Sequence, residues 1–591
     1  TQARFGYYMT VPVAALNAAL IGGLMNYVGG VDESLDVETY QVLTVVAILL
    51  VVVAPMLVFS NPVAAGGGAQ NPGGVIGWDD SLRWMSENTP DEGQYANPDG
   101  ENMSYYGTFG RTDDFDYDEG AYGVMSWWDY GHWITGQGER IPVANPFQQG
   151  SAEAAEYLLS QSESESFEVL ESIDEDDAKT KYVMVDWKMA ETESRPPVRG
   201  KFFAPPTFDD DSNRSTYYTR ILDTESLQQS GIFGSTQAIR HKQAYYDTTL
   251  ARLYHYHGSA QDTQPVVLDW EGAERSFQGS STTFVGAPSQ GNALKTFPNM
   301  TAAREFVEDD GTAQIGGIGP YPSERVPALE HYRLVHMSEL TGFQGQLSAA
   351  FRRTVGSSGL LDQLRRDLGA NASQNQLSQQ AIQFLYPNTP SWTKTFERVE
   401  GATIEGTGPE NTTLRLRAQM NPQNGASFVY RQQVTTDANG DFSTTVPYST
   451  TGYDEIGPEQ GYTNTSVRAT SPYSITAGIS VNESGSLTRW QTTVNVTEAQ
   501  VVGADDSVVT ADLEQEVVGQ TEGADGTSGS ESDGATDTGE GATNETETGT
   551  STNTTGTDSE TNTTGTDSGT NGTQSLTGPR TAGPDLEATR P

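Results

Sequence analysis

The sequence predicts a membrane α-helical hairpin that carries a mixed α/β external domain, an antiparallel β-sandwich domain and a disordered acidic tail. Val42–Phe59 is a run of 18 residues without a charge, close to the ~20 apolar residues that cross a bilayer as a helix. Within residues 391–503, Phe396–Ser480 alternates apolar and polar positions between closely spaced turn residues, as antiparallel strands do. Residues 504–591 are mostly Gly, Ser, Thr, Asn, Asp and Glu, a composition that cannot bury an apolar core.

Residues 1–60 are expected to form two transmembrane helices. Met9–Val28 is the second candidate span, and the proline and two asparagines inside it would be tolerated in the interior of a helix bundle. The acidic loop Gly29–Tyr40 has no basic residue, so the positive-inside rule does not orient the hairpin. A buried core helix is the alternative for Val42–Phe59. Residues 61–77, rich in Gly, Pro and Asn, are expected to be a linker.

Residues 78–390 are expected to form the mixed α/β domain. Apolar spacing and capping residues predict helices and strands in it. The expected elements are a helix from Trp78 through Met85 that ends before Pro90, a helix Ser151–Ser160 with Ser151 as its N-cap, a buried strand Tyr182–Val185 leading to Asp186 and a helix Gln237–Tyr256. His255 and His257 are two residues apart and would not align on one helix face, so we interpret them as structural.

The composition restricts the function. The 591 residues include no Cys, which excludes disulfides and thiolate metal sites. The net charge is −46, and only seven of the 33 basic residues are Lys. Acidic residues occur along the whole chain and not only in the tail, which indicates adaptation to concentrated salt that screens their repulsion. Such a charge argues against nucleic acid as a partner.

The stretch Ser126–Gly131 carries the strongest functional signal. Trp127, Trp128 and Asp129 together offer two flat apolar rings, two indole N–H donors and a carboxylate acceptor. A ligand hydroxyl could donate to Asp129, and a site that binds a hydroxyl rejects the analogue without it. The alternative is that the two Trp pack a core and Asp129 caps a helix.

The string Trp-Trp-Asp-Tyr-Gly resembles the signature of the oligosaccharyltransferase catalytic subunits, here the C-terminal part of an archaeal one from a salt-adapted source. These membrane enzymes move a glycan from a dolichyl phosphate carrier to Asn in Asn-X-Ser/Thr sequons. The resemblance implies that Trp127, Trp128 and Asp129 bind the Ser or Thr hydroxyl two positions after the acceptor Asn. Arg4, in Arg-Phe-Gly-Tyr-Tyr, would hold the lipid-linked phosphate, although an interfacial Arg beside a membrane span is the alternative.

A second motif, Asp186-Trp-Lys-Met189, resembles the family's Asp-x-x-Met element. The resemblance implies that Met189 lines the Ser/Thr pocket, where its thioether would contact a Thr methyl group. Core packing is the alternative for Met189. The family's Lys would be Lys201, although about ten extra residues, including Pro196 and Pro197, stand before it. Glu330–His336 resembles the family's last strand of this α/β domain.

The resemblance further implies a Mn²⁺ or Mg²⁺ cofactor held by carboxylates of an N-terminal part. The first residue is Thr and no signal peptide is visible, so we expect the sequence to be a fragment without that part, inactive alone. The expected location is the cell membrane, multi-pass, with the soluble domains on the external face. A membrane-anchored surface or adhesion glycoprotein has the same architecture, and the motifs discriminate against it.

Overall fold

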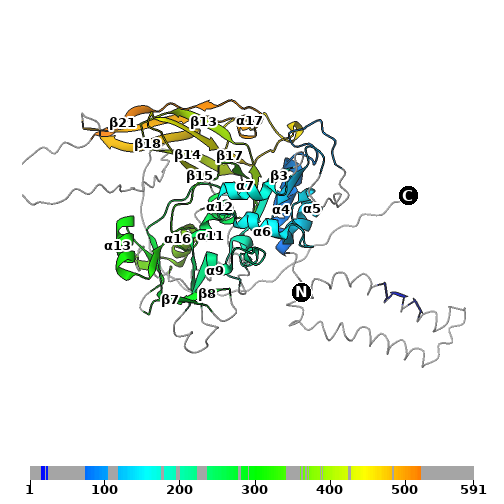
Figure 1. Ribbon diagram of the computed structural model, residues 1–591, viewed down its shortest axis with the longest axis horizontal. Coiled ribbons are helices and arrows are strands. Elements are labelled where there is room, and N and C mark those ends of the chain that lie inside the picture. The colour runs from blue at the N-terminus through cyan, green and yellow to red at the C-terminus, as the bar shows by residue number, and fades with distance from the viewer. Residues whose placement is uncertain are drawn as a thin grey trace, which may run out of the picture. The chain divides into compact units, whose positions relative to one another are not determined.

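The computed structural model describes residues 73–103, 117–174, 179–194, 200–222, 236–276, 281–289, 292–340, 372–385, 390–423, 427–481 and 485–520, with a few isolated positions in 15–23 and 360–388. Figure 1 shows their arrangement. Apart from the isolated positions in 15–23, the predicted membrane helices lie outside the described residues, as do Arg4 and the tail beyond residue 520. No helix within the described ranges has the length and apolar character needed to span a bilayer.

A five-stranded sheet is the centre of the mixed α/β part and has the strand order β11-β12-β3-β1-β2. β1 is parallel to β2 and β3, whereas β12 is antiparallel to β3 and β11. The strands are β1 Tyr122–Met125, β2 Ile141–Pro142, β3 Lys179–Asp186, β11 Tyr332–Met337 and β12 Thr393–Arg398. The helices packed around this sheet are α4 Gly73–Asn88, α5 Gly131–Gly138, α6 Ser151–Leu159 and α7 Glu163–Glu171 (blue to cyan in Figure 1), followed by α11 Gln243–Asp247 and α12 Thr249–Tyr256 (green).

The structure confirms the mixed α/β class, the helix that contains Trp78 and the strand that leads to Asp186, and it corrects several details. α4 begins at Gly73, inside the predicted linker. Ser151 is not an N-cap, because Gly150 holds that position with φ +66° and the Ser151 hydroxyl instead donates to the Gln148 carbonyl. The predicted helix over 237–256 was wrong in its first quarter, which belongs to strand β5 Thr236–His241.

Two smaller sheets extend the α/β part and have a hydrophobic core of their own. The four-stranded sheet contains β5 Thr236–His241, β4 Tyr218–Leu222, β8 Thr283–Gly286 and β7 Glu271–Ser276 in that order. The three-stranded sheet contains β10 Ala313–Ile315, β6 Val266–Asp269 and β9 Leu294–Thr296. The helices near them are α9 Arg214–Tyr217, α13 Met300–Asp310 and α16 Gln374–Leu385.

The structure also corrects the boundary at residue 390. We assigned residues 391–503 to the accessory domain and expected Glu330–His336 to be the last strand of the α/β domain. In the structure β12 inserts between β11 and β3, so residues 393–398 complete the central sheet. β12 is buried although its sequence, Thr-Lys-Thr-Phe-Glu-Arg, is largely polar. Partners distant in sequence satisfy several of these polar groups, such as the Tyr254 carbonyl, which accepts from Lys394 Nζ at 2.7 Å.

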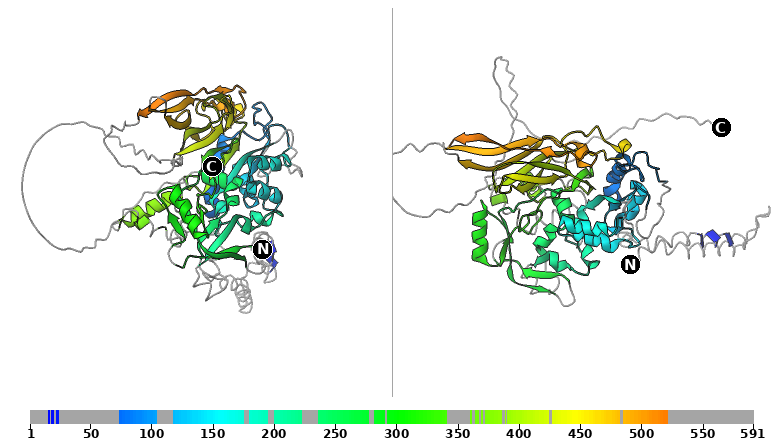
Figure 2. Two further views of the ribbon diagram at one scale, coloured as in Figure 1. Left: turned by 60° about the vertical axis from the view of Figure 1, so that its left-hand side comes forward. Right: turned by 45° about the horizontal axis from the view of Figure 1, so that its top comes forward.

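The C-terminal part is an antiparallel β domain, as expected, with one parallel pair between β13 and β20. Its strands form the sheets β16-β13-β20 and β15-β14-β18-β19-β21, with β17 paired to β14. They are β13 Ala402–Thr407, β14 Thr413–Pro422, β15 Phe428–Thr435, β16 Asp441–Val446, β17 Val467–Ala469, β18 Tyr473–Val481, β19 Ser486–Val494, β20 Val509–Thr510 and β21 Glu514–Gln520. Figure 2 shows these yellow and orange strands gathered on one side of the α/β part.

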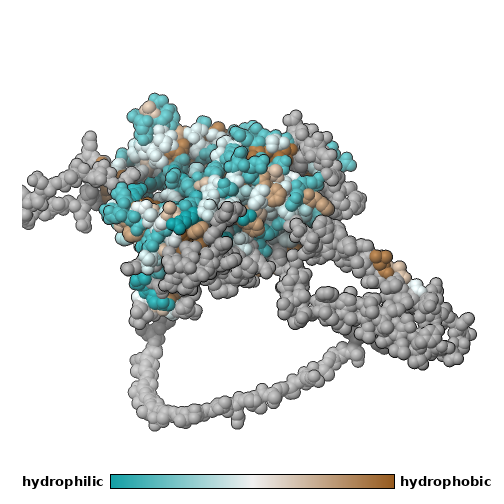
Figure 3. Space-filling model, turned by 60° about the horizontal axis from the view of Figure 1, so that its bottom comes forward, coloured by the Kyte–Doolittle hydropathy of each residue, from teal (hydrophilic) through white to brown (hydrophobic). Residues whose placement is uncertain are grey.

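The predicted tail therefore begins too early. Residues 504–520 contain β20 and β21, and Ala511 and Leu513 are buried. Residues 504–591 contain these few apolar residues together with a long polar segment. The average composition of the whole range therefore does not indicate the two strands. Figure 3 shows hydrophilic residues spread over much of the face in view, in agreement with the acidic composition.

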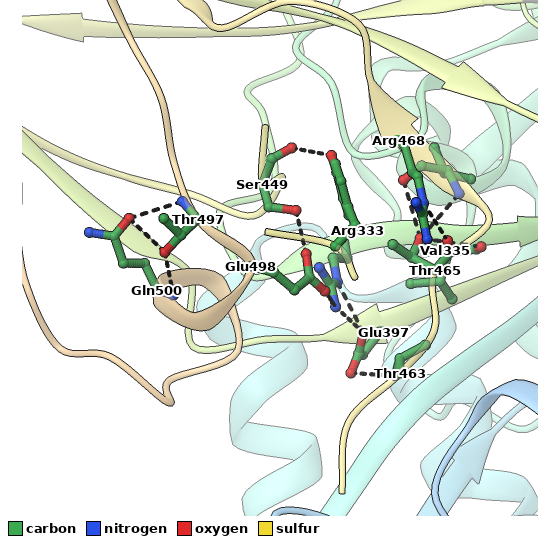
Figure 4. A network of polar contacts seen from close by, with 12 residues as sticks. Arg333, Val335, Glu397, Ser449, Thr463, Thr465, Arg468, Thr497, Glu498 and Gln500 are labelled. Atoms are coloured by element: carbon green, nitrogen blue, oxygen red, sulfur yellow. Dashed lines mark hydrogen bonds and ion pairs between the residues drawn. The ribbon is translucent and has the colours of Figure 1, made fainter. Parts of the chain in front are cut away.

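A buried ionic cluster joins the central sheet to the β domain. Arg333 on β11 donates to Glu397 on β12 at 2.7 Å and lies 2.7 Å from Glu498, which is in helix α17 Glu498–Val501 of the β domain. The three side chains are 2%, 0% and 1% exposed. Figure 4 shows Arg333 between the two carboxylates. Burial acts to lower the pKa of Arg333, but the carboxylates outweigh it and raise that pKa, so the guanidinium stays charged.

Candidate functional site

The Trp pair lies where β1 ends and the chain turns into the 3-10 helix η1 Trp128–Tyr130. Both rings are buried, and their centroids are 5.9 Å apart. Phe208 contacts them at centroid distances of 5.4 Å from Trp127 and 6.3 Å from Trp128. The two indoles are therefore packed mainly against other protein side chains, and Asp129 is the next residue in the chain.

Asp129 is partly exposed and forms an ion pair with Lys201. The distance from Lys201 Nζ to Asp129 Oδ2 is 2.9 Å, and the Lys201 and Asp129 side chains are 28% and 24% exposed, respectively. The same ammonium lies 4.5 Å from the centre of the Tyr130 ring. Because solvent reaches both partners, the pair contributes little to stability. The pair leaves the Asp129 carboxylate partly exposed to solvent.

Asp186 connects the two motifs. Its carboxylate accepts from the Tyr130 hydroxyl at 2.8 Å, from Trp78 Nε1 at 3.2 Å and from the Met189 backbone N–H at 3.0 Å. Burial and the nearby Asp186 raise the pKa of Tyr130 well above its usual range, so this hydroxyl acts as a neutral donor. Asp186 is the N-cap of the short helix α8 Trp187–Ala190. One carboxylate thus fixes α4, η1 and α8 relative to one another.

The position of Lys201 follows from backbone pairing. Gly200 donates to the Glu193 carbonyl at 2.9 Å, and Phe202 donates to the Glu191 carbonyl at 3.2 Å. Lys201 N–H donates to the Lys188 carbonyl of α8 at 2.6 Å. These bonds return the chain to α8 after the extra residues, of which 195–199 lie outside the described ranges. The insertion therefore does not prevent Lys201 from reaching Asp129.

The remaining predicted residues are placed less directly. The Met189 side chain is 1% exposed and packs in the core that also contains Trp127 and Trp128. Its link to the site is the backbone bond to Asp186. Arg4 lies outside the described residues, so its predicted role stays a prediction.

Sequence reasoning gave Asp186 no role and missed Trp78 and Phe208. For Asp186 a signal existed, because an Asp between a buried strand and a helix is a common N-cap. The contacts of Trp78 and Phe208 with the motif join residues that are far apart in the sequence, and no local pattern indicates them.

His255 and His257 make structural contacts. His257 accepts from or donates to Lys394 Nζ at 2.8 Å, and His255 pairs with the Tyr245 hydroxyl at 2.8 Å. Burial lowers the pKa of His255 to about 3, which keeps it neutral. Within the described part of the chain no three His, Asp or Glu side chains cluster in a way that could hold a metal ion. These residues therefore do not fit the implied Mn²⁺ or Mg²⁺ site.

Comparison with known proteins is consistent with the motifs. Residues 75–190 match a family model described as the AglB core domain, and residues 401–506 match one described as the archaeal glycosylation protein B long peripheral domain. The chain is 45% identical over 534 residues to the dolichyl-monophosphooligosaccharide–protein glycotransferase AglB of Haloferax volcanii, which covers 87% of this chain and 48% of that relative. The chain thus spans about half the length of this curated relative.

Solved structures of an Archaeoglobus fulgidus oligosaccharyltransferase also align with the chain. One, a complex with zinc and sulfate, aligns over 80% of this chain and 50% of that chain, with 21% identity and a TM-score of 0.45. Another, in complex with an inhibitory peptide and a dolichol-phosphate, aligns over 85% of this chain and 49% of that chain, with 19% identity and a TM-score of 0.44. On the sequence relationships, the resemblance carried by the motifs is confirmed, and the chain belongs to the archaeal AglB oligosaccharyltransferase family.

Proposed function

We propose that this chain is part of an enzyme that transfers a glycan from a dolichyl phosphate carrier to Asn of an Asn-X-Ser/Thr sequon. In that reaction the bond from the sugar carbon to the phosphate oxygen breaks, and its electron pair leaves with the phosphate. The Asn nitrogen forms the new bond to that carbon and loses a proton. The name of the Haloferax relative supports this chemistry. The role proposed for the described residues is recognition of the acceptor.

The observation that carries the proposal is the contact of Lys201 with Asp129, which brings residues 72 positions apart into one partly exposed site. We assign to Asp129 the acceptance of a hydrogen bond from the Ser or Thr hydroxyl at position +2, counted from the acceptor Asn. A carboxylate is a stronger hydrogen-bond acceptor than a neutral oxygen, and the contact with the Lys201 ammonium holds it in place. A hydrogen bond to a charged group contributes about 1.5–3 kcal/mol, enough to discriminate Ser and Thr from Ala by at least tenfold.

Trp127, Trp128 and Asp186 act as positioning residues in this proposal. The buried Trp pair anchors η1 in the core, and Asp186 forms hydrogen bonds with Tyr130 and with the start of α8. The backbone that carries the Asp129 carboxylate is therefore held in place. A fixed acceptor contributes more than a mobile one because less conformational freedom is lost when the peptide binds. Met189 would bring α8 against the Thr methyl group.

The remaining parts of the proposal concern residues that are not described. Arg4 would hold a phosphate oxygen of the donor lipid, and residues 1–60 would anchor the external domains to the cell membrane. A divalent metal ion, Mn²⁺ or Mg²⁺, would be held elsewhere in the enzyme. Residues 1–591 alone would then bind a sequon peptide weakly and transfer no glycan, which a gel-shift assay with a lipid-linked donor and Mn²⁺ tests.

The decisive experiment on Asp129 compares binding of two peptides, one with Asn-Val-Thr and one with Asn-Val-Ala. Asp129→Ala is expected to bind the Thr peptide about tenfold to a hundredfold more weakly and to lose the preference for Thr over Ala. Asp79→Ala is the matched control, because Asp79 also pairs with a cation, Arg83, but on the exposed face of α4. If Asp129→Ala keeps the preference with an unchanged melting curve, Asp129 does not bind the hydroxyl.

A further inference from the structure

Phe147 is an exposed aromatic side chain beside the candidate site. It is 67% exposed, and its ring lies 5.6 Å from the His132 ring at an angle of 71°. A single exposed apolar residue is ordinary on a protein surface. The position of this one, next to the Trp-Trp-Asp-Tyr-Gly motif, distinguishes it.

The loop that carries Phe147 is fixed by hydrogen bonds. The Asn145 side-chain oxygen accepts from the Phe147 backbone N–H at 2.9 Å, and the Asn145 amide donates to the Gln149 side chain at 2.9 Å. Gln148, with φ +65°, donates to the Asn145 carbonyl at 2.8 Å and closes the turn. The phenyl ring therefore stands at the tip of a closed loop and is presented to solvent by the backbone.

The motif itself holds this loop close. A Cβ atom on Gly131 would lie 2.2 Å from the Ala144 carbonyl oxygen and 2.8 Å from Asn145 Cα. The last residue of the motif must therefore be Gly, because the loop backbone packs directly on it. The loop and the motif form one surface.

Asp129 and His132 emerge on the same side of this surface. They are three residues apart in the continuous run of η1 and α5, a spacing that places side chains about 5–6 Å apart on one face. Trp128 and Tyr130, on the other sides, are buried, whereas His132 is exposed and Asp129 is half-exposed. Asp129, His132 and Phe147 thus form a ledge that begins at the carboxylate and ends at an apolar ring.

We propose that this ledge binds the acceptor polypeptide just after the sequon and prefers an apolar side chain at position +4. The inference rests on the proposed function, which places the +2 hydroxyl on Asp129. In an extended peptide the side chains of +2 and +4 point to the same side, about 6.8 Å apart. That spacing sets the +4 side chain over His132 and Phe147 when +2 is on Asp129.

An apolar subsite also suits the acidic, salt-adapted chain. Molar salt reduces the Debye length to about 3 Å and weakens contacts between exposed charges. Salt does not screen the hydrophobic contact between an apolar side chain and Phe147. The affinity gained from that contact therefore persists in molar salt.

The test uses the intact enzyme purified from its host membranes in molar salt. Fluorescent peptides Asn-Val-Thr-Gly-Leu and Asn-Val-Thr-Gly-Ser differ only at +4, and anisotropy gives their dissociation constants. The Leu peptide is expected to bind about fivefold more tightly, as partial burial of one Leu side chain allows. Phe147→Ser is expected to remove this difference, and Phe147→Leu to retain most of it. Val508→Ser is the matched control, since Val508 is an exposed apolar residue of the β domain.

The outcomes separate this inference from the proposed function. If an Asn-Val-Ala-Gly-Leu peptide binds as well as the Thr peptide, the assignment of +2 to Asp129 fails and the ledge fails with it. If the Thr requirement holds but Phe147→Ser retains the fivefold preference for Leu, or no preference exists in the unaltered enzyme, only the ledge is overturned. A preference that moves to a residue before the Asn also overturns it.

Discussion

The Arg333 cluster allows the sharpest test of the fold, namely Arg333→Met. This change leaves Glu397 and Glu498 buried without their cation and keeps much of the volume of the Arg stem. The carboxylates keep some donors, because Thr463 donates to Glu397 at 2.7 Å and Ser449 donates to Glu498. Removing one partner of a buried pair costs about 3–5 kcal/mol, against a total stability of about 5–15 kcal/mol for a typical protein. We expect the free energy of unfolding to fall by about 4 kcal/mol.

The assay is thermal unfolding in molar salt without guanidinium. Native-state hydrogen exchange is then measured for the central sheet and for the β domain. Arg83→Met is the control, because its pair with Asp79 is exposed and screened, so its removal should cost less than about 1 kcal/mol. Since Arg333 and Glu498 belong to different parts, amides of the central sheet and of the β domain should lose protection together.

A third variant separates charge from packing. Neutralising both carboxylates in the Arg333→Met background, with Glu397→Gln and Glu498→Gln, should recover part of the lost stability, because buried ions are then replaced by neutral polar groups. A loss of under about 1 kcal/mol in Arg333→Met, or protection lost from one part only, would refute the reasoning.

Three further predictions concern acceptor choice, pH and salt. Met189→Ala should shrink a preference of a few-fold for Thr over Ser peptides, since one buried methyl contributes about 0.8 kcal/mol, and equal use of both peptides by the unaltered enzyme would remove the idea. Burial lowers the pKa of His241 from 6.5 to about 3, so the unfolded chain binds its proton first and stability should fall as pH falls from 6.5 toward 3, by up to about 1.4 kcal/mol per pH unit. Stability curves of His241→Gln should be flatter in that window, and parallel curves would argue against the buried neutral ring. The chain should expand when molar salt is replaced by about 0.15 M salt, because the Debye length grows from about 3 Å to about 8 Å, and an unchanged radius by small-angle scattering would contradict salt adaptation.

The sequence predicted elements whose signals are local. Trp78, Leu82 and Met85 recur at helical spacing and all three are fully buried, so α4 could be predicted, and the apolar run 182–185 did the same for β3. β12 could not be predicted in its place, because its residues are polar and their burial depends on partners from other elements. Lys394 illustrates this, since burial lowers its pKa to about 7 and the acceptors it needs come from α12.

The candidate site divides in the same way. Trp127, Trp128 and Asp129 are consecutive, so their residue types and order can be recognised in the sequence. Lys201 reaches Asp129 because backbone hydrogen bonds join residues 200–202 to Lys188, Glu191 and Glu193, and no spacing rule predicts these bonds. A sequence motif therefore identifies the residues of a site that are consecutive in the chain. The partners of these residues depend on contacts between segments that are far apart in the sequence.

The insertion of β12 has a consequence for the order in which the protein can assemble. β3 ends at Asp186, but its second neighbour in the sheet arrives about 200 residues later, which at the usual 5–20 residues per second of synthesis is roughly 10–40 s. The N–H of Trp187, which opens α8, donates to the carbonyl of Trp392 just before β12, so α8 also waits for that segment. A nascent chain that has passed the motifs still has an open sheet edge that can pair with other chains. A truncation at residue 390 would make that edge permanent, so the candidate site becomes complete only after the ribosome has begun the domain that follows it.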